Sequence, residues 1–163
     1  MQDFLWAVAD KLRRLGLTGR QDKLALYFGR LWQGENTPCF YLPPPSLRRQ
    51  LLPCGRVRRE ITLELHYYPR QRKLPDEKIN ESGIAEQTRI GEGLVRGMGE
   101  LQGRQRAYRG RNLCWQAGND YLRFQAEYVY YTTLELEAAD GYSDLPESAE
   151  LMQFFELATN DKQ

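Results

Sequence analysis

Residues 120–137, DYLRFQAEYVYYTTLELE, alternate between apolar and polar side chains over nearly their whole length, and the strand that they predict is the basis of the expected fold. Such alternation is typical of a β-strand with one buried and one solvated face. At about 3.3 Å per residue a strand of this length spans roughly 60 Å, whereas a typical strand has about 5–6 residues. We therefore expect it to project, to bend, or to pair with another subunit. The face predicted to be buried consists of Leu122, Phe124, Ala126, Tyr128, Tyr130, Thr132, Leu134 and Leu136.

Two further segments belong to the same predicted sheet. Residues 104–117 precede the long strand predicted at 120–137. The turn Ala-Gly-Asn-Asp at 117–120 connects the two, and this sequence is typical of a β-hairpin. Residues 57–68 alternate as strictly, so that Val57, Ile61 and their neighbours at odd positions form one face. Both segments therefore favour antiparallel pairing with the long strand.

The N-terminal part of the chain predicts two shorter strands and an arm. Strands are expected at 24–32 and 39–42, and the prolines at 43–45 end the second because proline cannot donate to a β-ladder. The following segment, SLRRQLLPCGR at 46–56, is predicted to be a loop or arm rich in Arg and Leu.

Helical spacing appears twice. Residues 3–15 carry an amphipathic stripe, with Asp3 as the expected N-cap and Gly16 as the C-terminal stop. Residues 76–98 predict a second helix, in which glycines on the packed face allow a close approach to the sheet. The apolar stripe expected for this second helix is Ile84, Thr88, Gly91, Val95 and Met98, flanked by Ala85 and Leu94.

The order of these elements, α-β-β-β-α-β-β, indicates an α+β fold. We expect a twisted, mostly antiparallel sheet of about five strands, with both helices packed on one face and a long C-terminal hairpin. Residues 1–137 form the predicted domain. Residues 138–163 are predicted to be an acidic tail with a short helix at 147–158.

Composition excludes several classes of protein. The chain has 163 residues, of which 41% are apolar and 12% aromatic, so it contains enough apolar material for a core and is not expected to be disordered. No apolar run approaches the roughly 18 residues of a membrane span, and no basic segment precedes one as in a secretory signal. We therefore expect synthesis in the reducing environment of the cytoplasm.

The formal net charge of +1 conceals opposed blocks of charge. Residues 48–73 carry a net +6, residues 96–123 a net +4 and residues 124–163 a net −8. Segregated charge of this kind is suited to contacts with partners, although scattered solvated faces give the same totals.

The sequence offers little for catalysis or metal binding. His66 is the single histidine, and a solvated or interface role is the favoured interpretation. Cys39 and Cys114 follow apolar patterns and are expected to pack in the core, whereas Cys54 is expected to be exposed. No nucleophile elbow, phosphate loop or EF-hand spacing is present. We expect no enzyme activity, cofactor or metal.

Arginine is the residue type that suggests function. One set, Arg48, Arg49, Arg56, Arg58 and Arg59, fits a contact with the carboxylates Glu135, Glu137 and Asp140 of another subunit, or a contact with another protein. A second set, Arg104, Arg106, Arg109 and Arg111, is predicted to line a lumen. The alternative is a nucleic-acid-binding module, although the isoelectric point of about 7.7 lies below the value above about 9 that is typical of such domains.

Three further segments carry a recognisable pattern: QGENTPCFYL at residues 33–42, ITLELHYYP at residues 61–69, and residues 118–124 together with Tyr128. These segments resemble the tail terminator proteins of PBSX-like prophages and other phages with contractile tails. The first is similar to the strand of that family that begins "QG…PCF", the second to its "HYFP" strand and the third to its closing hairpin. The prolines after residue 42, the arginine-rich segment 99–113 and the acidic tail depart from the family pattern.

This resemblance implies a structural subunit that assembles into a hexameric ring. The ring would cap the head-proximal end of the tail tube, end polymerisation of the tube and of any sheath, and offer a surface to neck or head connector proteins. DNA would pass through the ring without sequence readout. The chain would be part of the virion tail or neck, with no membrane partner. Another head–tail connector or neck protein remains an alternative.

Overall fold

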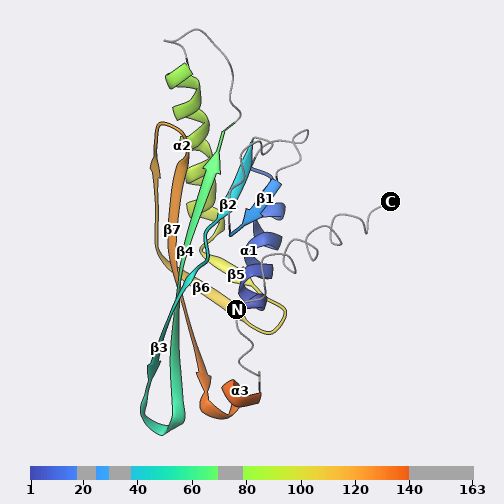
Figure 1. Cartoon of the computed structure of the whole chain (residues 1–163), viewed down its shortest axis with the longest axis vertical. Coiled ribbons are helices and arrows are strands. Elements are labelled where there is room, and N and C mark those ends of the chain that lie inside the picture. The colour runs from blue at the N-terminus through green and yellow to red at the C-terminus, as the bar shows by residue number, and fades with distance from the viewer. Residues whose placement is uncertain (18–24, 30–37, 70–78, 140–163) are drawn as a thin grey trace, which may run out of the picture.

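A computed structural model describes residues 1–17, 25–29, 38–69 and 79–139. Within these ranges the chain is a mixed α+β structure with a curled, mostly antiparallel sheet, as the sequence predicts (Figure 1). The helices are α1 (Gln2–Leu15), α2 (Ile79–Gly97) and α3 (Leu134–Ala139), with a 3₁₀ turn at Pro53–Gly55. The strands are β1 (Ala25–Phe28), β2 (Cys39–Leu42), β3 (Ser46–Leu51), β4 (Arg56–Tyr68), β5 (Glu100–Gln102), β6 (Ala107–Ala117) and β7 (Leu122–Thr133).

The sheet is built around the pairing of β4 with β7. These strands are antiparallel from Arg56 opposite Thr133 to Tyr67 opposite Leu122. The strand order is β1-β2-β4-β7-β6-β5, and β3 pairs with the part of β4 that β2 leaves open. Among the described strands, β1 and β2 form a parallel pair and the other pairs are antiparallel.

The prediction of about five strands is wrong, because the described residues contain seven. Residues 46–51 were expected to be a loop or arm but form β3, and the short β5 was not foreseen. In β3 five of the six side chains are exposed, so the strand lacks the alternation that identifies a half-buried strand. Residues 24 and 30–32 of the first predicted strand lie outside the described residues, as do residues 76–78 of the second predicted helix.

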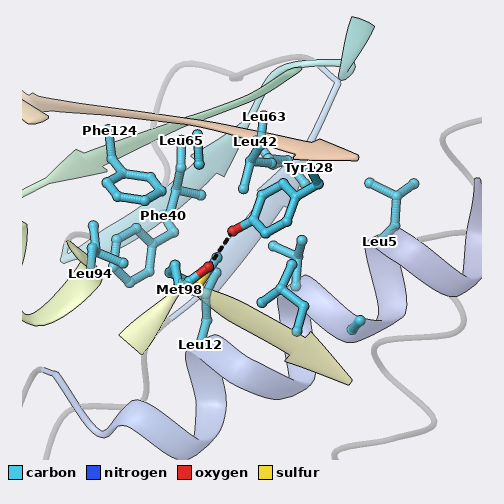
Figure 2. Close-up of a cluster of buried hydrophobic side chains, with 14 of the residues drawn as sticks. Leu5, Leu12, Phe40, Leu42, Leu63, Leu65, Leu94, Met98, Phe124 and Tyr128 are labelled. Carbon is cyan, nitrogen blue, oxygen red and sulfur yellow. Dashed lines mark hydrogen bonds between the residues drawn. The ribbon is translucent and has the colours of Figure 1, made fainter. Parts of the chain in front are cut away.

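One hydrophobic cluster joins the inner face of the sheet to α1 and α2 (Figure 2). Phe4 of α1 packs edge-on against the rings of Tyr108 and Tyr128, with ring centroids 5.2 Å apart in each pair. The Tyr128 hydroxyl is buried and donates a hydrogen bond of 2.7 Å to the carbonyl of Met98, as a buried hydroxyl requires. Burial raises the pKa of Tyr128.

Helix α1 has the predicted extent and ends at Gly16, whose φ of 55° is left-handed. The expected N-cap role of Asp3 is wrong, because Met1 occupies the N-cap position and Asp3 lies within the helix. The Asp3 carboxylate instead accepts hydrogen bonds from the amides of Arg104 (2.6 Å) and Gln105 (3.2 Å) and from the Tyr108 hydroxyl (3.0 Å). It therefore fastens the start of α1 to the turn between β5 and β6.

Helix α2 is present, and Gly91, Leu94 and Met98 of the predicted face are buried, but the prediction is wrong for Ile84 and Val95, which are exposed. The buried face turns toward the sheet through Ile90, Leu94 and Met98 together with the polar Gln87. Gln87 is buried because its amide exchanges two hydrogen bonds with the backbone of Gly118, in the turn of the β6–β7 hairpin. This polar requirement rotates the helix relative to a purely apolar stripe.

The glycines of α2 do allow close packing, as expected. A Cβ at Gly91 would lie well inside 3.0 Å of the Trp115 ring on β6, and one at Gly97 would similarly meet Leu15 at the end of α1. By contrast, nothing lies within 4 Å of a Cβ placed at Gly83.

The long predicted strand is shorter than expected, because β7 ends at Thr133 and residues 134–139 form α3. The Thr133 hydroxyl oxygen accepts a hydrogen bond of 3.4 Å from the Leu136 amide, which is an N-cap arrangement. Leu, Glu and Ala all favour helices, so the alternation in LELEAA reflects composition and not strand geometry.

Part of the sheet extends beyond the helix layer (Figure 1). We call this part the arm: it consists of β3, residues 52–60, residues 129–133 of β7, and α3. The expectation that the long strand projects is therefore met by this end of the β4–β7 pair.

Candidate assembly surface

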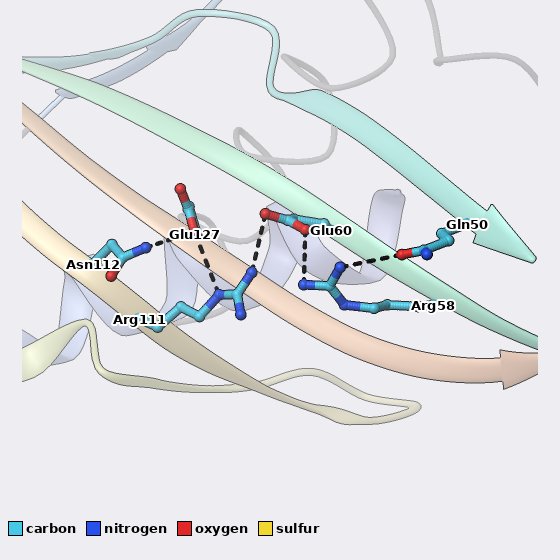
Figure 3. Close-up of polar contacts among 6 residues, drawn as sticks. All are labelled: Gln50, Arg58, Glu60, Arg111, Asn112 and Glu127. Atoms are coloured by element: carbon cyan, nitrogen blue, oxygen red, sulfur yellow. Dashed lines mark hydrogen bonds and ion pairs between the residues drawn. The ribbon is translucent and has the colours of Figure 1, made fainter. Parts of the chain in front are cut away.

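The outer face of the sheet, opposite the core, carries a chain of polar contacts across four strands (Figure 3). Glu60 of β4 lies 3.0 Å from both Arg58 and Arg111, and Arg111 lies 3.3 Å from Glu127 of β7. The chain ends at Gln50 of β3, which accepts a hydrogen bond from Arg58, and at Asn112 of β6, which donates one to Glu127. Exposed ion pairs contribute at most about 1 kcal/mol each, so this network orders the face more than it stabilises the fold.

A second cluster on the same face surrounds Glu64. Its carboxylate lies 2.7 Å from Arg123 Nη2 and 2.6 Å from His66 Nε2. Partial burial opposes ionisation, but the hydrogen bonds from Arg123 and His66 outweigh it and lower the pKa of Glu64.

His66 is held in this cluster by aromatic rings as well. It stacks on Tyr121 at a centroid distance of 4.6 Å and also neighbours Tyr41 and Tyr68. Its side chain is 13% exposed, so it is neither solvated nor part of the core. In the part of the chain that the structure describes, no group of three or more His, Cys, Asp or Glu side chains is placed to hold a metal ion.

The cysteines follow two of the three expectations. Cys39 is buried and Cys54 is exposed, as predicted, but Cys114 is exposed and not packed in the core. The reason is a bulge between Arg111 and Cys114, where Asn112 has a φ of 53°. One extra residue reverses which side chains face inward, so Trp115 packs against the core and Cys114 faces outward.

The arginines predicted to contact other subunits lie in the arm, but on both of its faces. Arg48 is exposed on the outer face opposite Glu60, and Arg58 takes part in the network described above. Arg56 lies over the ring of Tyr131 at 5.6 Å. On the inner face Arg49 is opposite Arg59 in the register, and Arg59 donates a hydrogen bond of 3.4 Å to the Tyr130 hydroxyl.

The acidic residues predicted to contact these arginines belong to the other edge of the arm, where the structure describes them. Glu135 is exposed in α3, and Glu137 lies in the same helix. Asp140 and the rest of the predicted acidic tail, with its helix at 147–158, lie outside the described residues. Because the arm runs in the order β3, β4, β7 and then α3, the arginine-rich edge and the α3 edge face away from each other.

The structure does not bring the four predicted lumen arginines together on one surface. Arg104 lies over the ring of Trp6 at 4.8 Å and Arg106 over that of Tyr130 at 4.9 Å, both on the helix side. Arg109 and Arg111 are exposed on β6 and lie opposite outer-face residues of β7.

Sequence reasoning missed the exposed apolar residues of the arm. Leu134 and Leu136 were assigned to the buried face of a strand, and Leu51 to a loop, yet all three are exposed. A signal was available, because a threonine followed by LELEAA matches a helix N-cap and a run of helix-forming residues.

Comparison with known proteins gives no family for this chain, since no protein-family model matches it and no curated protein shows significant similarity. None of the helices in the described ranges is long and apolar enough to cross a membrane.

Proposed function

We propose that this protein is a ring-forming tail terminator of a phage or phage-tail-like particle. The observation that carries the proposal is the arm, in which the central β4–β7 pair continues past the helix layer and ends in two edges of opposite charge with exposed apolar side chains. The resemblance of three segments to the terminator family supports the same function.

A ring requires two different surfaces on each copy, placed so that successive head-to-tail contacts close. The two edges of the arm meet this requirement, and unlike charges on them favour the correct register. We propose a hexamer that caps the head-proximal end of the tail tube and presents its opposite side to neck or head connector proteins. A sheath protein is a further proposed partner in a contractile particle.

The proposal includes the family arrangement with both large helices on one face of the sheet. It is supported by Phe4 of α1 and Leu94 of α2, which belong to one cluster with the inner-face residues of β4 and β7. The outer face then remains for contacts with other proteins. As proposed, the chain is a structural virion component, assembled in the bacterial cytoplasm, without catalytic activity.

Two alternatives remain: a nucleic-acid-binding module, and another head–tail connector or neck protein. The arginines favour the first, but Arg58, Arg111 and Arg123 are engaged with carboxylates of the same chain. Chromatography on immobilised duplex DNA distinguishes a nucleic-acid-binding module from an assembly protein. Retention that falls steeply with salt supports a binding module, whereas elution at about 0.15 M salt supports an assembly protein that DNA merely traverses.

Electron microscopy of tube growth tests the proposed function. The tube subunit of the same particle is polymerised with increasing amounts of this protein, and tube lengths are measured. A terminator shortens the tubes in proportion to its amount and appears as a cap at one end. Tubes of unchanged length with no cap would contradict the proposal.

A further inference from the structure

The end of the arm exposes apolar side chains that a solvated surface does not require. Among the described residues, six large apolar side chains are exposed, and four of them lie in the arm. These are Leu51 (59% exposed), Tyr131 (56%), Leu134 (42%) and Leu136 (56%). They fall into two groups, with Leu51 at the end of β3, and the other three at the end of β7 and in α3.

The arm also ends in two strand edges. In the described sheet, β3 pairs with β4 alone. On the other side, the ladder between β6 and β7 reaches only as far as Arg109 opposite Val129, so residues 130–133 of β7 continue past it. An exposed strand edge favours association with another chain.

The two edges carry opposite charge. Strand β3, Ser46–Leu51, contains Arg48 and Arg49 and no acidic residue. Helix α3, Leu134–Ala139, contains two glutamates and no basic residue. Two copies that met through the same edge would place like charges together, whereas unlike edges attract.

We propose that the β3 edge of one copy docks against the β7–α3 edge of the next copy. This contact rests on the proposed function, because it supplies the head-to-tail interface that a ring needs. Leu51 of one copy meets the Leu134–Leu136 surface of its neighbour, while Arg48 and Arg49 lie against the acidic helix α3 that carries the exposed Glu135. The occupant of each edge is therefore a second copy of this chain.

Charge reversal in two separate proteins tests this contact. One variant carries Arg48→Glu and Arg49→Glu, and the other carries Glu135→Arg and Glu137→Arg. Arg58 is left unchanged, because it pairs with Glu60 within the chain. Each variant alone presents two edges of the same sign, and we expect the protein concentration at half-assembly to rise by about a hundredfold or more. An equimolar mixture restores unlike edges at every contact, so it assembles like the wild type with the two variants alternating.

The assembly is measured by size-exclusion chromatography with light scattering, with and without the tube subunit. Circular dichroism checks that each variant is folded, and a variant with Arg13→Glu and Arg96→Glu, two helix positions outside the arm, controls for the change in net charge of the Arg48→Glu, Arg49→Glu variant. Recovery in the mixture alone supports the contact. Assembly of either variant by itself, or no recovery in the mixture of folded variants, overturns it.

The outcome also separates this contact from the proposed function. If the variants cap tubes as well as the wild type does, the proposed function stands and this contact is wrong. If the wild type neither assembles nor shortens tubes, the proposed function fails and the contact fails with it.

Discussion

Asp3, in the first turn of α1, accepts a hydrogen bond from the hydroxyl of Tyr108 on β6, with 3.0 Å between Oδ2 and the hydroxyl oxygen. The same carboxylate receives two backbone amides of the β5–β6 turn, so one side chain near the N-terminus fixes a connection about a hundred residues away. Burial and the nearby Asp3 carboxylate raise the pKa of Tyr108.

Replacing Asp3 with alanine removes all three hydrogen bonds and leaves the Tyr108 hydroxyl without its acceptor. We expect the free energy of unfolding in urea to fall by about 2 kcal/mol, since hydrogen bonds to a charged group are worth about 1.5–3 kcal/mol each and these are partly exposed. Asp10→Ala is the control, because Asp10 forms an i,i+4 ion pair with the exposed Arg14, and such pairs contribute about 0.3–0.5 kcal/mol. Equal losses in the two variants would contradict the role of Asp3.

Two glycine-to-alanine substitutions in α2 should change the free energy of unfolding in opposite directions. Gly91→Ala places a methyl group against the Trp115 ring and should destabilise the protein by about 1–3 kcal/mol, as overpacking does. Gly83→Ala meets open space and should stabilise it by up to about 1 kcal/mol through helix propensity. Thermal unfolding of both variants checks this, and a stable Gly91→Ala protein would show that α2 does not approach β6 so closely.

Alkaline unfolding should depend on Tyr128. Its pKa is raised in the folded chain, so its contribution to stability is complete below about pH 10, the ordinary tyrosine value, and is lost as the pH rises above it. Tyr128→Phe should lower stability by about 1 kcal/mol at pH 7 through the lost hydrogen bond to Met98, yet reduce the further loss at alkaline pH. Urea titrations between pH 7 and 11 measure both effects. Tyr131→Phe, at an exposed position, serves as the control for the substitution itself.

Acid should weaken the cluster around Glu64. Because the pKa of Glu64 is lowered in the folded chain, its contribution is present above about pH 4.3, the ordinary value for Glu, and disappears as the pH falls through the lower folded value. Glu64→Gln should therefore be less stable than the wild type at pH 7, with a difference that shrinks toward pH 3. The exposed Glu92→Gln serves as the control. A difference that does not depend on pH would contradict the assignment.

The elements that could be predicted are those whose pattern and packing agree. Helix α1 and strands β4 and β7 each present one apolar face to the core, and their periodicity is visible in the sequence. The αL cap at Gly16 and the closely packed glycine at position 91 were also predictable, since glycine suits both situations.

The misassigned elements are those in which another requirement outweighs periodicity. Strand β3 has two largely exposed faces, the hydrogen bonds of Gln87 to Gly118 set the rotation of α2, and the bulge at Asn112 reverses the side-chain order before Cys114. For the proposed assembly surface, the sequence predicted the arginines and glutamates that the structure places in the arm. It did not show that they lie on opposite edges, because that depends on which strands are neighbours.

Native mass spectrometry of the wild-type protein, alone and with the tube subunit, tests directly whether the chain forms the proposed closed ring. Head-to-tail contacts that close into a hexameric ring predict one dominant assembly of six 19.1 kDa chains, with no larger series. A species limited to dimers, which indicates a two-fold contact, or an open-ended ladder of masses, which indicates a filament, would contradict it.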